Sequence, residues 1–268
     1  MVGLFQVLRG AEGGGFQKPQ PLNGTDGKSL AIASSGKDVT GRICTRPFAV
    51  DWDGDGDLDL VVGNFDGQFF LFAGEGKGRF APKSEPLRAG GEPLRLPRDH
   101  HGDPFVVDWD GDGDLDILSG SASGSIYLAE NVAGKGQKPN LKPFEALVRN
   151  NQDDWRGAKP QFAAKLPGHP FRAVRIWVGD IDGDGDLDIL AGDQVSVSHA
   201  AKGIDRETFE KKLAAWEKGM KEVREKLSAT KDTTEQRKLQ ERWSDLYAER
   251  SKFVEDEISG FVWLYRRK

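Results

Sequence analysis

The 268-residue sequence predicts a mainly β protein that is assembled from repeated small sheets and interrupted by one helical insertion. An aspartate-rich segment occurs three times in nearly the same form, each time between short apolar runs of the kind that form buried strands. Glycine is frequent, with 34 residues, which is typical of β proteins with many tight turns. A heptad pattern of apolar residues is confined to the last quarter of the chain and indicates helices there.

The three aspartate segments are the most informative feature of the sequence. Each has five aspartates in nine residues, and the segments are Asp51–Asp59, Asp108–Asp116 and Asp180–Asp188. Without their negative charges, the net charge of the chain would change from −5 to +10. Because five neighbouring carboxylates repel one another strongly, we expect a cation within each segment.

The spacing of the aspartates predicts how such a cation would be held. Side chains at positions 1, 3, 5 and 9 of each loop would surround one ion, position 7 would contribute its backbone carbonyl, and the glycine at position 6 would permit the sharp turn. The predicted side-chain ligands are Asp51, Asp53, Asp55, Asp59, Asp108, Asp110, Asp112, Asp116, Asp180, Asp182, Asp184 and Asp188. The predicted carbonyl ligands are Asp57, Asp114 and Asp186. All-oxygen ligation by several carboxylates suits Ca²⁺ better than Mg²⁺, so we expect three Ca²⁺ sites rather than three solvated acidic turns.

The residues that flank the loops exclude an EF-hand, which needs two helices and a glutamate at position 12. Position 12 is occupied by Val62, Ser119 and Ala191. Apolar runs precede and follow each loop, so the unit is strand, loop, strand. The predicted strands before the loops are 47–50, 104–107 and 174–178, and those after them are 58–63, 115–120 and 187–192. One further strand follows each unit at 67–72, 124–129 and 260–265, and residues 3–8 resemble a fourth copy of it.

The loops start 57 and 72 residues apart, which is a period typical of radially arranged small sheets. The D-x-D-G-D-G-x-x-D loop between strands resembles the FG-GAP/VCBS repeat family, the calcium-loop β-propellers that include the head domains of integrin α-subunits. The chain looks most like FG-GAP proteins of planctomycete-type bacteria, in which a helical insertion and a closing G-x-V-W-L-x strand recur. The resemblance covers roughly residues 1–200 and 259–268, and it implies that calcium in the three loops is structural.

Three calcium blades and part of a fourth are at the lower limit for a closed propeller. We therefore expect the chain to be a segment of a larger propeller, or its missing blades to come from another chain. The expected domains are propeller blades over 1–204, a helical hairpin over 205–258 and a final propeller strand over 259–268.

The predicted insertion has two helices. In the first, apolar residues alternate at spacings of four and three, and they are Phe209, Leu213, Trp216, Met220, Val223 and Leu227. In the second helix, the corresponding apolar residues are Leu239, Trp243, Leu246 and Phe253, and Arg250 occupies one position of the same pattern. Asp205 and Asp232 are the expected N-caps. We expect an antiparallel, coiled-coil-like hairpin, which is either a self-contained decoration or a docking arm for a partner.

Several other classes of protein do not fit the sequence. No apolar run is long enough to span a membrane, and a single cysteine, Cys44, excludes an internal disulfide or a cysteine zinc cluster. The acidic loops would oppose a nucleic acid. No signal peptide is visible, so an extracytoplasmic location (periplasmic, secreted or at the cell surface) is inferred from the calcium that the loops require.

The function that the sequence predicts is a calcium-binding β-propeller that acts as an extracytoplasmic module for protein or glycan binding, or for adhesion. Two alternatives stay open. One is a polysaccharide lyase or hydrolase, with candidate residues Arg149, Asp153, Asp154 and Arg156 in the segment 134–166. The other is an assembly subunit that docks through the helical hairpin. Since no catalytic constellation is visible, a binding protein is favoured over an enzyme.

Overall fold

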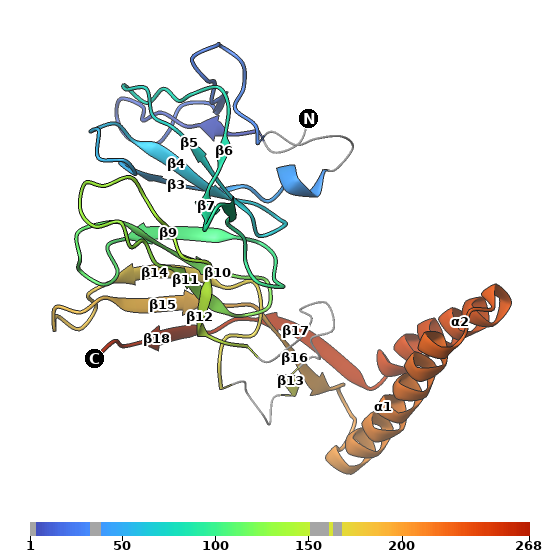
Figure 1. The fold of residues 1–268 in the computed structure, drawn as a ribbon. Coiled ribbons are helices and arrows are strands. Elements are labelled where there is room, and N and C mark those ends of the chain that lie inside the picture. Colours follow the sequence, from blue (N-terminus) through green and yellow to red (C-terminus); the bar gives the residue numbers. More distant parts are fainter. Residues whose placement is uncertain (1–3, 33–38, 151–160, 163–167) are drawn as a thin grey trace. The chain divides into compact units, whose positions relative to one another are not determined.

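The computed structural model describes residues 4–32, 39–150, 161–162 and 168–268, with the backbone alone for 161–162. The chain divides into two compact units, which are described separately (Figure 1). The first unit comprises Met1–Ala158, Gly168–Gln194 and Gly260–Lys268, and the second comprises Lys159–Pro167 and Val195–Ser259.

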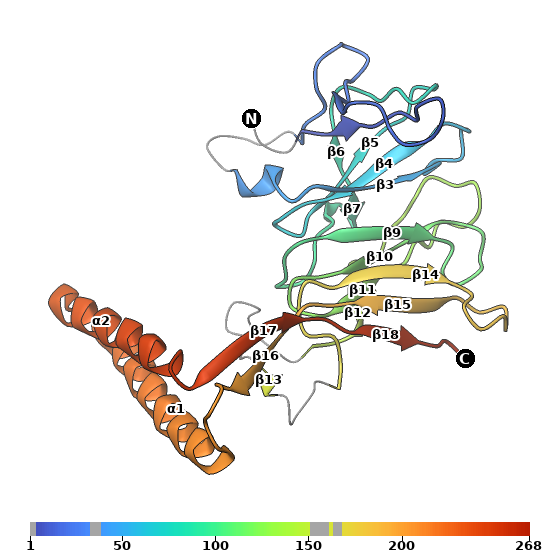
Figure 2. The same cartoon turned by 180° about the vertical axis from the view of Figure 1, so that it is seen from behind.

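The first unit contains three similar antiparallel sheets that follow one another in chain order (Figures 1 and 2). The first sheet has the order β3 (Arg46–Val50), β4 (Asp59–Gly63), β5 (Phe69–Phe72) and β6 (Glu85–Pro86). The second has the order β9 (Asp103–Val107), β10 (Asp116–Gly120), β11 (Ile126–Ala129) and β12 (Glu145–Val148). The third has the order β14 (Arg175–Gly179), β15 (Asp188–Gly192) and β18 (Val262–Tyr265). Its last strand is therefore separated in sequence from its partner β15 by the segment Val195–Ser259 of the second unit.

Smaller elements complete the first unit. They are two two-stranded sheets, β1 (Gln6–Val7) with β2 (Gln20–Pro21) and β7 (Arg88–Ala89) with β8 (Glu92–Pro93), and a 3₁₀ helix, Thr40–Arg42. The three strands expected around and after each aspartate loop are thus present, with ends within three residues of the predicted ones.

The second unit combines a three-stranded sheet with two helices. Its elements are β13 (Gln161–Phe162), β16 (Val195–Ala200), α1 (Arg206–Ala229), α2 (Thr233–Arg250) and β17 (Val254–Ser259). Here the predicted boundaries at 204/205 and 258/259 differ from the structure, because β16 and β17 pair with each other over six residues and belong to the second unit. The strand β17, Val-Glu-Asp-Glu-Ile-Ser, was hidden by its three consecutive acidic residues, which oppose the apolar alternation of a strand.

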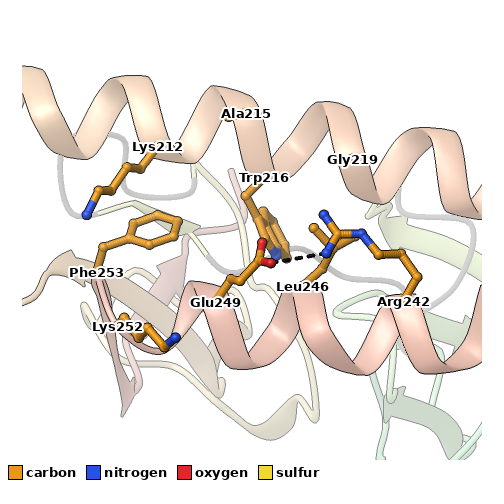
Figure 3. Close-up of a pocket in the computed structure, with 9 residues that line it drawn as sticks. All are labelled: Lys212, Ala215, Trp216, Gly219, Arg242, Leu246, Glu249, Lys252 and Phe253. Atoms are coloured by element: carbon orange, nitrogen blue, oxygen red, sulfur yellow. Dashed lines mark hydrogen bonds and ion pairs between the residues drawn. The ribbon is translucent and has the colours of Figure 1, made fainter.

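The two helices begin at the predicted caps and pack against each other. The Asp205 side chain accepts a hydrogen bond from the Thr208 N–H, and the Asp232 side chain accepts one from the Glu235 N–H. Met220, Val223 and Leu246 are buried between the helices. A cavity of about 380 Å³ lies along the pair (Figure 3), lined by Lys212, Ala215, Trp216, Gly219, Arg242, Leu246, Glu249, Lys252 and Phe253.

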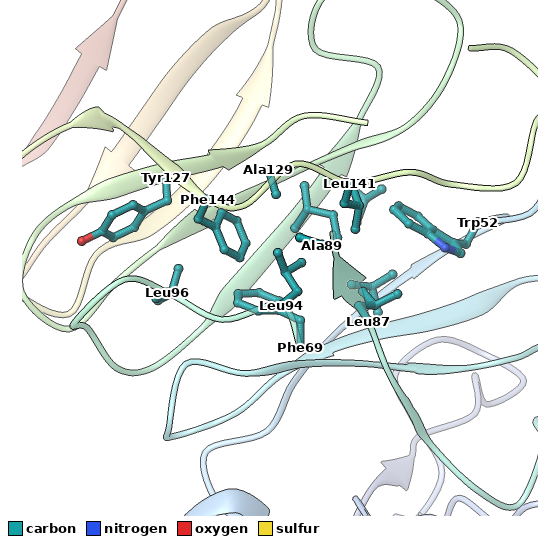
Figure 4. Close-up of a cluster of buried hydrophobic side chains, with 13 residues drawn as sticks. Trp52, Phe69, Leu87, Ala89, Leu94, Leu96, Tyr127, Ala129, Leu141 and Phe144 are labelled. Carbon is teal, nitrogen blue, oxygen red and sulfur yellow. The ribbon is translucent and has the colours of Figure 1, made fainter. Parts of the chain in front are cut away.

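In the first unit, the central strands β4 and β10 are buried on both faces because their side chains alternate between two neighbouring layers. Val61 of β4 belongs to a cluster shared with the second sheet (Figure 4), whereas Leu60 and Val62 face residues of the amino-terminal segment such as Phe5. On β10 the same alternation holds: Ile117 packs toward the first sheet, and Leu118 belongs to the cluster shared with the third sheet. The sheets are therefore stacked face to face, as the repeated apolar runs predicted.

The third sheet ends this stack, and the described residues do not close into a ring of blades. Trp177, Val262 and Leu264 on its outward face are 52%, 76% and 41% exposed. No described element of the first unit covers them.

Candidate metal centre

Each aspartate loop joins two neighbouring, paired strands at the same point of its sheet. The residue before the loop pairs with the aspartate at position 9, in the pairs Val50–Asp59, Val107–Asp116 and Gly179–Asp188. The three loops therefore leave and re-enter a sheet at adjacent positions, and position 9 is the first residue of the following strand.

The first aspartate of each loop holds the backbone of the turn. In the first loop, Asp51 accepts hydrogen bonds from the N–H groups of Gly54 (2.9 Å) and Gly56 (3.1 Å). Both glycines have positive φ angles, 78° and 94°, a conformation that side chains with a Cβ rarely adopt. Asp108 and Asp180 make the same pair of bonds in their loops. The sequence analysis assigned this role to the glycine at position 6 only and missed the one at position 4, although the repeated D-G-D-G pattern carries that signal.

The ninth aspartate is buried and ties the loop to the strand that follows. Both oxygens of Asp116 accept backbone bonds, from Trp109 (2.9 Å) and from Asn131 (2.7 Å). Asp59 does the same with Trp52 and Gly74, and Asp188 does so with Ile181 and Arg267. Position 9 therefore fixes the entrance of the loop against the neighbouring strand, a structural role that the ligand pattern alone did not show.

Positions 1, 3 and 9 of each loop come together. In each trio every carboxylate offers one oxygen, and these oxygens all lie within 4.8 Å of one another. The trios are Asp51, Asp53 and Asp59; Asp108, Asp110 and Asp116; and Asp180, Asp182 and Asp188. Within the described part of the chain, no other group of three or more His, Cys, Asp or Glu residues is arranged in this way.

Positions 5 and 7 lie outside these trios. The side chains of Asp55, Asp112 and Asp184 accept a hydrogen bond from the N–H of position 7, so each supports the turn. At position 7, one oxygen of Asp114 accepts a bond from the Gly134 N–H (2.6 Å), and the other is buried with no hydrogen-bond partner among the described residues. The predicted ligand roles of positions 5 and 7 thus remain predictions.

Burial makes these carboxylates costly as anions. The pKa of Asp116 is raised to about 6, mainly by burial and further by Asp110 and Asp114. Burial, followed by the neighbouring aspartates, also raises the pKa of Asp53 and of Asp114. A cation among the loop oxygens would reverse this effect, because an adjacent positive charge favours the charged form of a carboxylate.

The third loop differs in its surroundings. The Nε atom of Arg266 lies 3.5 Å from Oδ2 of Asp182, so one of the trio already has a basic neighbour. The described residues form no ion pair with the aspartates of the first two loops. At position 2, Trp52 is buried and Trp109 is half-buried, whereas Ile181 of the third loop is 37% exposed.

The donor set suits a hard divalent cation. It consists of carboxylate oxygens on a tightly folded turn. Beside the trio of the second loop, Oδ1 of Asp114 is buried with no hydrogen-bond partner among the described residues. Such all-oxygen sites select Ca²⁺ or Mg²⁺ over the transition metals that prefer nitrogen and sulfur.

The residues proposed for an enzyme do not assemble into a site that the structure describes. Arg149 is exposed, and Asp153, Asp154 and Arg156 lie outside the described residues. One group that the sequence analysis did not single out is the buried carboxylate of Asp99, which accepts hydrogen bonds from Ser123 and Tyr127. All the hydrogen-bond donors to Asp99 are neutral, so we assign this carboxylate a structural role.

Comparison with known proteins gives one match. The model of the FG-GAP-like repeat matches residues 51–119 and again 108–191, and each match starts at the first aspartate of a loop. No curated protein and no solved structure matches the chain. Among the described residues, no helix has the length and apolar character that crossing a membrane would require.

Proposed function

Because the chain belongs to the FG-GAP-like repeat family, we propose that its three aspartate loops bind Ca²⁺ and that the sheets they brace form part of a β-propeller. The observation that carries this proposal is the convergence of three carboxylates in every loop, with oxygens within 4.8 Å of one another. In each loop, positions 1, 3 and 9 would supply ligand oxygens. Ca²⁺ would supply positive charge and would have no part in a reaction.

The proposed role of the whole is an extracytoplasmic module that binds a protein or a glycan, or that mediates adhesion. Calcium would stabilise the module by linkage, since the folded loops exist only in the native state. Sites built on exposed turns need a compartment with abundant free Ca²⁺, which supports a periplasmic, secreted or cell-surface location. We also propose that α1 and α2 form the antiparallel hairpin that the heptads predict, because Met220 and Val223 of one helix are buried with Leu246 of the other.

The first test is thermal unfolding in excess EGTA, followed by restoration of Ca²⁺ or Mg²⁺ at millimolar concentration. A ligand present at 100 times its Kd stabilises the folded state by about 2.7 kcal/mol per site, which corresponds to a rise of several degrees in the melting temperature. We expect Ca²⁺ to raise the midpoint and Mg²⁺ to raise it much less. A midpoint of thermal unfolding that does not change when Ca²⁺ is added at these concentrations would refute the proposal.

A matched pair of variants locates the binding in the loops. Asp53→Asn removes a proposed side-chain ligand, whereas Asp57→Asn makes the same charge change in the same loop at a position proposed to bind through its backbone carbonyl. Calorimetric titration after removal of Ca²⁺ should show one site weakened at least about tenfold by Asp53→Asn, and a clearly smaller effect of Asp57→Asn. Equal effects of the two variants would mean that the loop attracts Ca²⁺ by charge alone.

A further inference from the structure

We propose that Arg267 is a positioning residue that joins the second aspartate loop to the third, so that these two loops bind Ca²⁺ cooperatively while the first binds it independently. This inference rests on the proposed function, because it concerns the binding of Ca²⁺ in the same loops. Arg267 lies two residues beyond the end of β18, the last strand of the third sheet. Its backbone contacts the third loop and its side chain contacts the second.

The backbone of Arg267 holds the third loop. Its N–H donates to Oδ1 of Asp188 at 3.1 Å, and the Ile181 N–H donates to Oδ2 of the same carboxylate, also at 3.1 Å. Asp188 is buried and belongs to the trio of this loop. The preceding residue, Arg266, lies beside a second member of the trio, Asp182. The last residues of the chain therefore contact two of the three carboxylates that would bind the ion in the third loop.

The side chain of Arg267 holds the second loop. Its guanidinium lies 5.0 Å from the ring centre of Trp109 and donates a hydrogen bond to the Trp109 carbonyl. Trp109 stands between Asp108 and Asp110 in the sequence, and its N–H donates to Oδ2 of Asp116 at 2.9 Å. These three aspartates are the trio of the second loop. The single residue that Arg267 grips is thus joined, by a peptide bond or a hydrogen bond, to every member of that trio.

The first loop has no such link to a neighbouring sheet. The residues whose N–H donates to Oδ1 of the ninth aspartate occupy equivalent positions in the three repeats, and they are Gly74, Asn131 and Arg267. Gly74 has no side chain, and the side-chain oxygen of Asn131 accepts from the Asn140 N–H of its own repeat at 2.8 Å. Among the described residues, every hydrogen bond that a first-loop carboxylate accepts comes from residues 52–74. Only Arg267 reaches the loop of another sheet from this position.

These contacts predict the sign of the coupling. A loop whose carboxylates are already held loses less conformational freedom on binding a cation, so that binding in either loop should favour binding in the other. Repulsion between two bound cations would act in the opposite direction, and salt weakens it. Linkage requires that the two sites change each other's affinity by the same factor. A positive and reciprocal coupling is therefore the signature of the path through Arg267.

Calorimetric titration of the full chain with Ca²⁺, after removal of bound metal, measures this coupling. The reference protein carries Asp53→Asn, which weakens the first site. Adding Asp182→Asn leaves the second site alone, and adding Asp110→Asn leaves the third, and neither change alters a contact of Arg267. If the sites are independent, the curve of the reference protein is the sum of the two single-site curves. We expect instead that each site binds Ca²⁺ at least about fivefold more tightly when the other is intact, by the same factor in both directions.

The variant Arg267→Gln tests the path itself. It keeps the backbone N–H that Asp188 accepts but removes the guanidinium from Trp109, so the coupling factor should fall below about twofold. Lys268→Gln is the matched control, because it removes the same charge at the next residue and should leave the factor unchanged. Hydrogen exchange gives a second readout: in the protein with only the third site intact, Ca²⁺ should slow exchange of the Trp109 amide at least about threefold and leave the Trp52 amide of the first loop unchanged.

Three results would overturn the inference. Additive curves in the protein that retains Arg267 would show that the two sites are independent, even if Arg267→Gln lowers the melting temperature. A negative coupling would show that repulsion between the cations prevails. A coupling factor that persists in Arg267→Gln would attribute the effect to the charges that the aspartate substitutions remove. All three require that Ca²⁺ binds, whereas single-site proteins that bind no Ca²⁺ would refute the proposed function itself.

Discussion

The Nη1 atom of Arg175 lies 2.9 Å from Oδ1 of Asp103, and this ion pair joins the first strands of the second and third sheets. Asp103 also faces Arg46 of the first sheet, so one carboxylate serves both neighbours. Burial, followed by the nearby Arg175, lowers the pKa of the Arg46 guanidinium, and Asp103 opposes that shift. Asp103 of the second sheet thus balances two positive charges, which the first and third sheets bring to it.

Replacing this carboxylate should weaken the contact between the sheets. We expect Asp103→Asn to lower the free energy of unfolding by about 1 kcal/mol, because it leaves the mostly buried Arg46 without its acidic partner, and the half-exposed Arg175 limits the loss. Urea unfolding of the calcium-saturated protein measures the difference. Asp26→Asn is the control, since its partner Lys28 is 85% exposed, and an equal loss there would rule out a special role for Asp103.

Acidification should act through His101. Its pKa is lowered to about 4, mainly by burial and further by Arg46, whereas the usual value is 6.5. Between pH 6.5 and pH 4 the unfolded chain therefore binds a proton that the folded chain does not, and the contribution of His101 to stability is lost as the pH falls through this window.

The variant that isolates this contribution is His101→Asn. His101 has a φ of 59°, a left-handed conformation that asparagine tolerates better than other non-glycine residues. We expect the melting temperature of the original protein to fall more between pH 7 and pH 5 than that of the variant. Parallel losses would show that His101 does not titrate differently in the folded state.

The buried carboxylate of Asp99 should depend on each of its donors. The Tyr127 hydroxyl donates to Oδ2 of Asp99 at 3.1 Å, and burial raises the pKa of Tyr127 to about 12. Tyr127→Phe removes this donor and should cost about 1–2 kcal/mol in urea unfolding. Tyr247→Phe removes a hydroxyl from a residue that is 48% exposed on α2 and should change nothing measurable. Similar losses for the two would contradict a donor role for Tyr127.

The third loop should bind Ca²⁺ more weakly than its ligand set suggests, because Arg266 lies beside Asp182. Arg266→Gln should raise the affinity of this site several-fold by removing a positive charge next to the ion. Calorimetry in a background that carries Asp53→Asn and Asp110→Asn isolates the third site. Lys268→Gln makes the same charge change two residues away, and an equal gain from it would attribute the effect to net charge.

In the second unit, Arg250 is a buried charge within a helix pair. It is 6% exposed, donates to Oδ1 of Asp256 at 2.8 Å, and lies with its guanidinium 5.3 Å from the ring centre of Trp216. Arg250→Lys keeps the charge but loses the forked geometry, so we expect a loss of about 2 kcal/mol in the helical transition at 222 nm. Arg206→Lys, in an exposed pair with Glu210, is the control. Equal losses of stability in the two lysine variants would show that the forked geometry of the Arg250 guanidinium does not contribute.

The sequence was informative where residue type and local spacing determine the outcome. The strands around the loops and the caps Asp205 and Asp232 follow from neighbouring residues, and the structure contains them. Pairings between distant residues could not be predicted in this way. Nothing in the heptad pattern shows that Arg250 forms an ion pair with Asp256, nor that Val195–Ala200 pairs with Val254–Ser259. Such contacts depend on which segments the folded chain brings together.

The aspartate loops also combine contacts that local spacing predicts with contacts between distant residues that it does not. The sequence placed the side chains of positions 1, 3, 5 and 9 around one point, and the structure groups those of positions 1, 3 and 9. It gave no sign that both oxygens of position 9 accept backbone hydrogen bonds, since one donor lies outside the loop. For Asp59 and Asp116 that donor is 15 residues further along the chain.

For Asp188 the donor is Arg267, 79 residues further along. During synthesis the first two loops can therefore close as soon as their own sheets leave the ribosome, whereas the third must wait for β18 and the last residues of the chain. Because closing a longer loop costs more chain entropy, this sheet should also be the last to form in refolding from denaturant. The three repeats have similar structures, yet we expect the third to fold later than the other two.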